Sequence, residues 1–479
     1  MLNRKLLTLL RGFEPIEWKR LHKFLLSPYF NDAYNAEAIT RLFEHIRKHK
    51  AQEDKPQLLR KQTFKYVFSD KVYTEGDLEL DRLMSDLLKL IKTFLVQEGY
   101  RQGANTELHE TLALAKYYGR IGLPDLFDRS IEQSRKMLTK KVIKDSEFHL
   151  DAFMLEREVV EFSSLSDTLK GDSNLLVTHE HLDLFYAISK MELACALKFR
   201  QSLTSVEPRF SFSLSEKIVE MIEKGTLDNP ILRGYFGIFH ILSNPIDEAD
   251  ILKLEAILVE VKSTIPHNKY LQMQTYVRSF WAKLSRIFRD TEHSDKLFEV
   301  YKKHLEAGYL YRNNQIQPMT LSNCITLALR AKQLAWAEKV LNDHPPTKIQ
   351  DFEQSVEVYN LNVANFYFHK KQYDMAEKLL TFTFDNVYYA INANIILIKI
   401  YFETHFPIID DKIAAFRVKV SRSAIPTERK QILYNFLNRL SKIIELRHSK
   451  DTTKKAKLLE EIKIQNNIVE KEWLIEKCS

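Results

Sequence analysis

A ten-residue pattern that occurs twice constrains the fold of this chain more than any other feature. Residues 332–341 read KQLAWAEKVL, and residues 371–380, which start 39 positions later, read KQYDMAEKLL. In the second copy SVEVYNLNVANFYFHKKQ precedes YDMAEKLL, so a helical pattern, a short polar turn and another helical pattern follow one another. A chain that repeats such a unit is expected to fold as successive helix pairs.

Small residues occur where the two helices of a pair would meet. Ala364 lies one turn before Tyr367 on the first helix and Ala376 opens the second, while Ala328 and Ala337 take the corresponding places upstream. Antiparallel helices approach closely only where small side chains face each other, and a bulky aromatic residue fills the neighbouring groove. We therefore predict that these alanines are buried at helix contacts.

The register continues downstream of the second copy. Tyr401 lies 34 residues after Tyr367, and each tyrosine is followed by a phenylalanine, Phe402 and Phe368. A period of 34 to 39 residues built from helix pairs is typical of a solenoid, in which each unit buries its faces against its neighbours.

This stretch resembles a tetratricopeptide-repeat (TPR) array. The matching residues are Ala364, Tyr367, Ala376, Leu379 and Leu380. The sequence departs from the repeat at Asn360, where a tryptophan is usual, at Val363, where a Leu-Gly pair would begin, and at Tyr388, near the place of the closing proline. The resemblance implies a divergent TPR-like α-solenoid whose first helices line a concave surface.

Apolar residues recur at spacings of three and four along nearly the whole chain, which is the pattern of amphipathic helices. The clearest case, residues 77–96, has the apolar residues Leu80, Leu83, Met84, Leu87, Leu88, Ile91, Phe94 and Leu95. Turn-forming residues separate roughly twenty such stretches. We predict an all-α fold of antiparallel helix pairs stacked as a divergent TPR-like solenoid.

Four regions are expected within this fold. They are an N-terminal helical subdomain (1–100), a middle helical region (104–265), TPR-like helical repeats (266–448) and a C-terminal amphipathic capping helix (449–479). The apolar stripe of the last region consists of Leu458, Ile462, Val469 and Trp473. A terminal helix with one apolar side suits the cap that a solenoid needs, because the end unit has no neighbour to cover it.

The chain as a whole resembles an uncharacterised family of helical, TPR-like proteins from Bacteroidota. The stretches that carry this likeness are FLLSPYFN, LMSDLLKLIKTFL, YGRIGLPDLF, AISKMELACAL, YNLNVANFYFHKKQYDMAEKLL and AAFRVKVSRS. These motifs are structural, so the resemblance implies relatives and a helical fold without implying an activity.

Composition argues against several kinds of catalytic site. The 479 residues include only 11 glycines, and neither a phosphate-binding GxGxxG or GxxxxGK[ST] nor a nucleophile elbow GxSxG occurs. The three cysteines form no CxxC pair, HExxH is absent, and His45 and His49 lack further ligands nearby, so we interpret them as a solvated surface pair. We predict no catalytic residues, no metal and no cofactor; an enzyme with an unrecognised site remains an alternative.

If the TPR register holds, the first helices present a groove for an extended peptide. The groove residues would be Thr326, Arg330, Asn365, His369, Lys399 and Glu403, three pairs at the four-residue spacing that places side chains on one helix face. Asn365 and Lys399 would hold a carboxylate or a backbone amide. The alternative is that all six are ordinary exposed polar residues.

A basic segment offers a second hypothesis. Residues 417–457 contain twelve Lys or Arg against three acids, an excess of nine that exceeds the net charge of +7 for the whole chain. Such a surface attracts polyanions. The residues proposed for RNA or DNA binding are Arg417, Lys419, Arg422, Arg429 and Lys430. The alternative is a solvated helix face that acidic neighbours complement.

The leading hypothesis is a non-catalytic scaffold that binds a protein or peptide partner in the groove. No stretch supplies the roughly 18 uninterrupted apolar residues of a membrane span. The amino terminus lacks a signal-peptide pattern and the cysteines suggest no disulfide framework, so we expect a cytoplasmic protein without a membrane partner.

Overall fold

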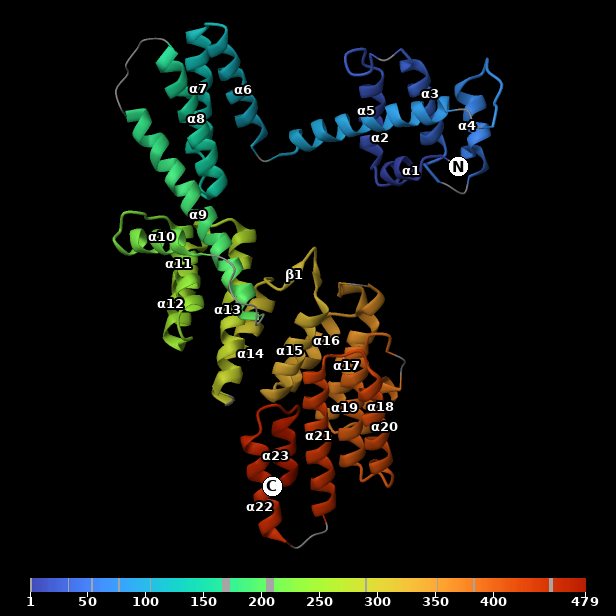
Figure 1. Cartoon of the computed structure of the whole chain (residues 1–479), viewed down its shortest axis with the longest axis vertical. Helices are drawn as coiled ribbons and strands as arrows, with labels where there is room; N and C mark the ends of the chain where they lie inside the picture. Colours follow the sequence, from blue (N-terminus) through green and yellow to red (C-terminus); the bar gives the residue numbers. More distant parts are fainter. Residues whose placement is uncertain are drawn as a thin grey trace. The chain divides into compact units, whose positions relative to one another are not determined.

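The computed structural model describes residues 2–32, 34–52, 55–75, 78–103, 105–165, 173–203, 211–288, 291–350, 352–381, 384–447 and 451–479. Over these residues the fold is all-α, with 23 α-helices, three short 3-10 helices and one two-stranded hairpin (Figure 1). The chain divides into two compact units. Unit 1 comprises residues 1–141 and 151–179, and unit 2 comprises residues 142–150 and 180–479.

In unit 1 several helices pack on a neighbour in the chain. Its helices are α1 (Arg4–Arg11), α2 (Pro15–Leu25), α3 (Ala36–Lys48), α4 (Arg60–Val67), α5 (Glu79–Arg101), α6 (Thr106–Arg120), α7 (Pro124–Thr139) and parts of α8 (Ser146–Leu165) and α9 (Ser173–Leu203), with a 3-10 turn at Pro56–Leu58. Helix α5 buries Leu80, Leu83, Leu87 and Ile91 against α2 and α3. The periodicity of residues 77–96 therefore predicted this helix and its buried face correctly.

Unit 2 continues the sequential packing of helices. Its further elements are α10 (Ser213–Glu223), α11 (Pro230–Ser243), α12 (Glu248–Val261), α13 (His267–Phe288), α14 (Thr291–Glu306), β1 (Tyr311–Arg312), β2 (Gln315–Ile316), α15 (Pro318–Arg330), α16 (Leu334–Asp343), α17 (Phe352–His369), α18 (Tyr373–Leu380), α19 (Val387–Glu403), α20 (Ile409–Arg422), α21 (Thr427–Leu446), α22 (Thr452–Ile464) and α23 (Lys471–Cys478), with 3-10 turns at Lys262–Thr264 and Pro346–Lys348. From α10 onward each helix packs on the next, and α17 also packs on both α15 and α19.

The alanines of the repeated pattern lie at these helix contacts. Ala328, Ala337, Ala364 and Ala376 are all fully buried. Helix α15 packs against α16, and α17 packs against α18, as the two copies of the decapeptide predicted. The prediction of close helix pairs at small residues is confirmed.

The turn between the helices of a pair has the same backbone geometry three times. Lys332, Lys371 and His405 each adopt a left-handed conformation, with φ of 56°, 59° and 54°. The amide after each of them donates to a carbonyl five residues earlier, on Ala328, Tyr367 and Tyr401 respectively. These acceptors are 39 and 34 residues apart, which are the same spacings as those found between the repeated sequence patterns.

Two features differ from the predicted organisation. Residues 449–479 were expected as one helix, but their described part contains α22 and α23, separated at residues 465–470, where Glu470 has a φ of 53°. Leu458, Ile462 and Trp473 are buried and Val469 is partly buried, so the apolar stripe is divided between the two helices and the turn. The left-handed residue at position 470 changes the chain direction, which a straight helix cannot do.

The compact units are also divided differently from the predicted regions. Helices α8 and α9 each contribute residues to both units, and residues 104–265 do not form a unit of their own. Boundaries between the two units fall inside α8 and α9. A helix has no Gly-, Pro- or Ser-rich linker at such a point, so the sequence carries no signal for these boundaries. Among the described helices, none is both long enough and apolar enough to span a membrane.

Candidate functional site

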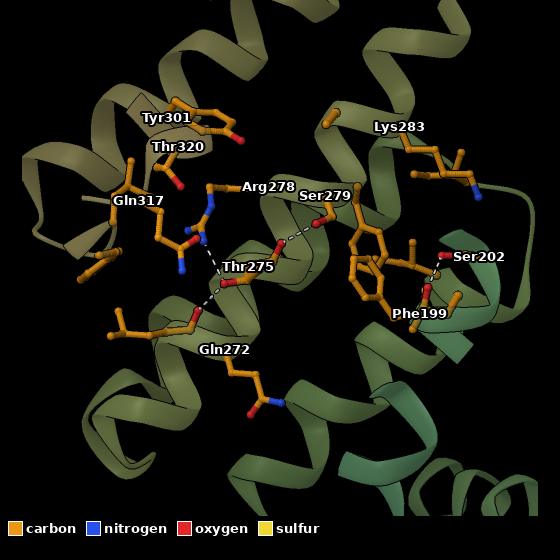
Figure 2. Close-up of a pocket in the computed structure, with 18 of the residues that line it drawn as sticks. Phe199, Ser202, Gln272, Thr275, Arg278, Ser279, Lys283, Tyr301, Gln317 and Thr320 are labelled. Atoms are coloured by element: carbon orange, nitrogen blue, oxygen red, sulfur yellow. Dashed lines mark hydrogen bonds between the residues drawn. The ribbon is translucent and has the colours of Figure 1, made fainter. Parts of the chain in front are cut away.

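Unit 2 contains a cavity of about 980 Å³ beside helix α13 (Figure 2). One wall is a face of α13, and the others come from the ends of α9 and α11, from Tyr301 of α14, from the chain around β1 and from the start of α15. Its volume is at the upper end of the range usual for ligand sites, about 300 to 1,000 Å³.

The amphipathic pattern of α13 explains why one of its faces is available. Its apolar stripe is buried in the core of unit 2 through Tyr270, Met273, Val277, Trp281 and Leu284. The opposite stripe faces the cavity and consists of Asn268, Leu271, Gln272, Thr275, Arg278, Ser279, Ala282, Lys283, Arg286 and Ile287. Spacings of three and four place these residues along one side of the helix.

Arg278 is the central cation of the cavity. Its guanidinium donates to His304 Nδ1 at 3.0 Å and to Thr275 Oγ1 at 2.8 Å, the second bond being visible in Figure 2. Burial lowers the pKa of Arg278. Among the described residues Arg278 forms no ion pair with a carboxylate, so its charge is balanced by neutral acceptors alone.

The hydrogen bond to His304 requires a neutral imidazole. Burial, together with the charges of Arg278 and Lys303, lowers the pKa of His304 to about 3. At neutral pH its Nδ1 therefore carries a lone pair that accepts from Arg278, and the ring proton is on Nε2.

The remaining charged residues of the cavity have the same sign. Lys283, Arg286 and Arg312 join Arg278 in the lining, and the described lining contains neither aspartate nor glutamate. Lys283 and Arg312 are exposed. Polar side chains such as Gln272, Gln317 and Thr320 lie between these cations, and apolar walls include Phe199, Ile241, Phe280 and Leu310. A concave surface lined by one sign of charge concentrates oppositely charged ligands.

The hairpin that carries Arg312 is fixed by hydrogen bonds. Asn313 and Asn314 both have positive φ, as a two-residue type I′ turn requires. The Tyr311 hydroxyl donates to His344 Nε2 at 2.7 Å, because His344 Nδ1 is used to donate to the Val340 carbonyl at 2.7 Å. This hairpin differs from the all-helical organisation predicted from the sequence.

The structure divides the six residues predicted to line a groove. Thr326 and Asn365 are half-buried, while Arg330 and His369 are exposed. The expected exposure of Lys399 is wrong: its side chain is 4% exposed, and its ammonium donates to the Glu470 carboxylate at 2.7 Å. Glu403 accepts a hydrogen bond from Trp473 Nε1 at 2.9 Å and pairs with Lys477 at 2.8 Å. Helix α23 and the residue before it thus cover the Lys399 end of the predicted groove.

Two cations of the predicted groove, Lys399 and Arg330, act on Glu470. Burial raises the pKa of this carboxyl, but the charge and hydrogen bond of Lys399, together with the charge of Arg330, outweigh it and hold the pKa below its usual value. His369 retains solvent exposure, yet the protein atoms around its ring and the charge of Lys399 lower its pKa to about 4. The groove residues therefore cooperate around a carboxylate that belongs to the same chain.

The five residues proposed for nucleic-acid binding lie on α20 and α21, while the predicted basic segment 417–457 extends into α22 and includes residues 448–450, which lie outside the described residues. Lys419, Arg422 and Arg429 are exposed, whereas Arg417 and Lys430 are half-buried, and Lys430 Nζ donates to the Ser421 carbonyl at 2.8 Å. Arg439, in the same segment, pairs with Glu461 of α22. An acid from outside the segment thus neutralises part of its charge.

His45, Cys195 and Cys324 are buried in the core. The surface position expected for His45 is wrong, because it is buried, bonds to the Gln57 carbonyl at 2.9 Å and stacks on Tyr66. Cys195 and Cys324 are buried, and burial raises the pKa of both thiols. Within the described part of the chain, no three His, Cys, Asp or Glu residues are grouped as a metal site would require.

The chain has no significant match among protein-family models, curated proteins or solved structures. The likenesses to TPR arrays and to the Bacteroidota family remain predictions from sequence.

Proposed function

We propose that this protein is a non-catalytic scaffold of TPR-like helix pairs that binds an acidic peptide segment of a protein partner in the cavity beside α13. The observation that carries the proposal is the charge of the lining, with the cations Arg278, Lys283 and Arg312 and no described carboxylate. Arg278 is half-buried and is held by neutral acceptors, so a ligand carboxylate would supply a counter-charge that the described lining lacks.

An extended peptide fits the shape of the lining better than a compact anion. The lining stripe of α13 runs from Asn268 to Ile287, which corresponds to roughly 28 Å at 1.5 Å per residue. Asn268, Gln272 and Gln317 provide amide groups that can pair with a peptide backbone, and Tyr301 and Tyr309 provide aromatic surface. Cations at several points along such a stripe match several acidic side chains rather than one.

The solenoid part of the proposal is supported by the recurrence of one turn geometry at Lys332, Lys371 and His405. The first helices α15, α17 and α19 pack in sequence, an arrangement in which solenoids present a continuous binding surface. Helix α13 precedes this row as the first helix of its own pair with α14.

The titratable groups of the cavity support binding rather than catalysis. Tyr301 and Tyr311 have pKa values raised by burial, so they are neutral hydroxyls at pH 7. The Nδ1 lone pair of His304 is already used by Arg278. A catalytic site requires a base free to accept a proton from a substrate.

A labelled twelve-residue peptide, (Glu-Asp-Glu-Tyr)₃, tests the proposal by fluorescence anisotropy, with (Lys-Arg-Lys-Tyr)₃ as its charge-reversed control. We expect the full chain to bind the acidic peptide only, with affinity that decreases steeply as salt is added. Lys283→Gln combined with Arg312→Gln removes two exposed cations of the lining and should weaken binding at least tenfold.

Lys217→Gln is the matched control, because Lys217 is exposed on α10 outside the cavity. It should leave the affinity within about twofold of wild type, as expected for a surface charge away from the site. Equal losses in the control and in the double variant would contradict the proposed site, and so would equal binding of the two peptides.

A further inference from the structure

The chain provides its own occupant for the Lys399 end of the predicted groove. Glu470 and the first turns of α23 lie against Lys399 and Glu403 of α19, 71 and 70 positions away in sequence. This site is separate from the α13 cavity, and none of its residues lines that cavity. The inference below is therefore independent of the function proposed above.

Trp473 is the apolar anchor of this contact. Its ring is 8% exposed and meets Phe402 edge to face, with centroids 5.3 Å apart, and Phe436 at 6.4 Å. Its Nε1 donates to Glu403 at 2.9 Å. A buried aromatic ring whose polar atom is satisfied is the usual form of an energetic anchor in recognition.

Glu470 is the polar anchor, and Lys399 joins the two halves of the site. The Lys399 ammonium pairs with Glu470 and also lies over the rings of Phe368 at 4.4 Å and Trp473 at 5.6 Å. The Glu470 side chain is 35% exposed, so it lies at the edge of the site, next to solvent. Glu470 is the residue just before α23 and Trp473 is in its first turn, so both anchors lie at the start of the helix.

Helix α23 resembles a bound peptide, because its helical conformation depends on the surface that it covers. It has eight residues, too few to be stable as an isolated helix. A buried ion pair adds little net stability compared with an apolar contact, but it discriminates strongly between matched and unmatched partners.

We propose that Phe368, Lys399, Phe402 and Glu403 form a docking site for segments with an acidic residue three positions before a tryptophan, and that α23 with Glu470 is its exchangeable occupant in cis. A partner protein that carries such a Glu-x-x-Trp segment competes with α23 for the site. Its carboxylate takes the place of Glu470 on Lys399, and its indole takes the place of Trp473 against Phe402 and Phe436.

The first test uses a labelled peptide of residues 466–479 with Cys478 replaced by serine. The full chain carrying Glu470→Ala and Trp473→Ala presents an open site, and we expect it to bind this peptide. Wild type should bind at least tenfold more weakly, because the tethered segment competes at an effective concentration in the millimolar range. Adding Lys399→Met to the open-site variant should abolish binding.

Glu472→Ala is the matched control, since Glu472 is exposed on α23; this variant should bind the peptide as weakly as wild type does. Absence of binding to the open-site variant, or binding that does not depend on Lys399, would overturn the proposal.

A second test needs no substitution in the protein. Cys478 is half-buried at the end of α23, while Cys195 and Cys324 are buried in the core. Adding the unlabelled serine-containing peptide up to millimolar concentration should displace α23 and increase the rate at which a thiol reagent modifies Cys478 severalfold. The same peptide with its tryptophan replaced by alanine should have no effect. An unchanged rate with the intact peptide would exclude displacement, whatever the folding of the variants.

Discussion

Two cations in unit 2 show how differently a charged residue can be accommodated. Lys399 is 4% exposed and pairs with the carboxylate of Glu470. Arg278 is half-buried and is held by the neutral acceptors His304 and Thr275. Because the second arrangement leaves a net positive charge in a cavity, we assign the ligand site to Arg278 and the internal docking contact to Lys399.

His304 makes the stability of unit 2 depend on pH. Its pKa is about 3 in the folded chain, against 6.5 when it is solvated. Unfolding therefore takes up a proton at every pH between these values, so stability falls as the pH is lowered below 6.5. This residue alone contributes at most about 1.4 kcal/mol of unfolding free energy per pH unit.

His304→Gln keeps a side-chain oxygen that can accept from Arg278 but does not titrate. We expect the decrease in melting temperature between pH 7 and pH 4.5 to be a few degrees smaller in this variant than in wild type. Some pH dependence will remain, because the pKa of His149 is also lowered, to about 4. The exposed His267 provides a control: His267→Gln should reproduce the wild-type profile. Identical profiles for all three proteins would contradict the assignment.

At the scale of elements, helix pairs are held by alanine contacts and by a turn that uses no glycine. The left-handed residues are Lys332, Lys371 and His405. Non-glycine residues adopt this conformation at a cost, which the hydrogen bond across each turn offsets. Buried alanines on both sides of the turn then allow the helices to approach.

Ala376→Leu tests this packing directly. Ala376 is fully buried between α17 and α18, so three additional carbons must displace neighbouring side chains. We expect a loss of about 1 to 3 kcal/mol in unfolding free energy. Ala415→Leu places the same side chain on an exposed position of α20 and should change stability by less than about 0.5 kcal/mol. Thermal unfolding monitored by circular dichroism distinguishes the two, and equal effects would be inconsistent with a close contact at Ala376.

At the scale of the whole molecule, the net charge of +7 is distributed unevenly. The basic segment of α20 and α21 belongs to elements that do not line the α13 cavity. Because the two positive surfaces share no lining residue, we expect them to bind ligands independently.

Replacing Arg417, Lys419, Arg422, Arg429 and Lys430 together by glutamine tests this independence. We expect the affinity for the acidic peptide to change by less than about twofold, because the cations of the cavity remain. A decrease as large as that of Lys283→Gln with Arg312→Gln would show that the peptide binds the basic segment instead.

The same variant tests the alternative hypothesis from the sequence, nucleic-acid binding by residues 417–457. A labelled 20-nucleotide RNA that binds wild type at low salt, loses affinity as salt is added and fails to bind the variant would support a nucleic-acid site. Absence of a mobility shift at low salt would end that hypothesis.

The sequence by itself determined the all-helical character of this protein and several of its local helix contacts. The three-and-four spacing predicted α5 and its buried face, and the repeated decapeptide predicted the alanine contacts of α15 with α16 and of α17 with α18. Both signals lie within short stretches of contiguous residues, where helical geometry alone decides which side chains share a face. The hairpin at Tyr311–Ile316 was missed because two residues per strand are too few to show an alternating pattern.

Only the tertiary structure decided which charges meet. Arg278 and Arg312 line one cavity although they belong to different elements, and Lys399 finds its carboxylate 71 positions away in the chain. The sequence predicted Lys399 to be an exposed groove residue. A helical pattern indicates on which face of the helix a side chain lies, but it does not indicate which other segment of the chain covers that face. Burial and pairing of charges depend on the packing of distant segments, and no local periodicity encodes that packing.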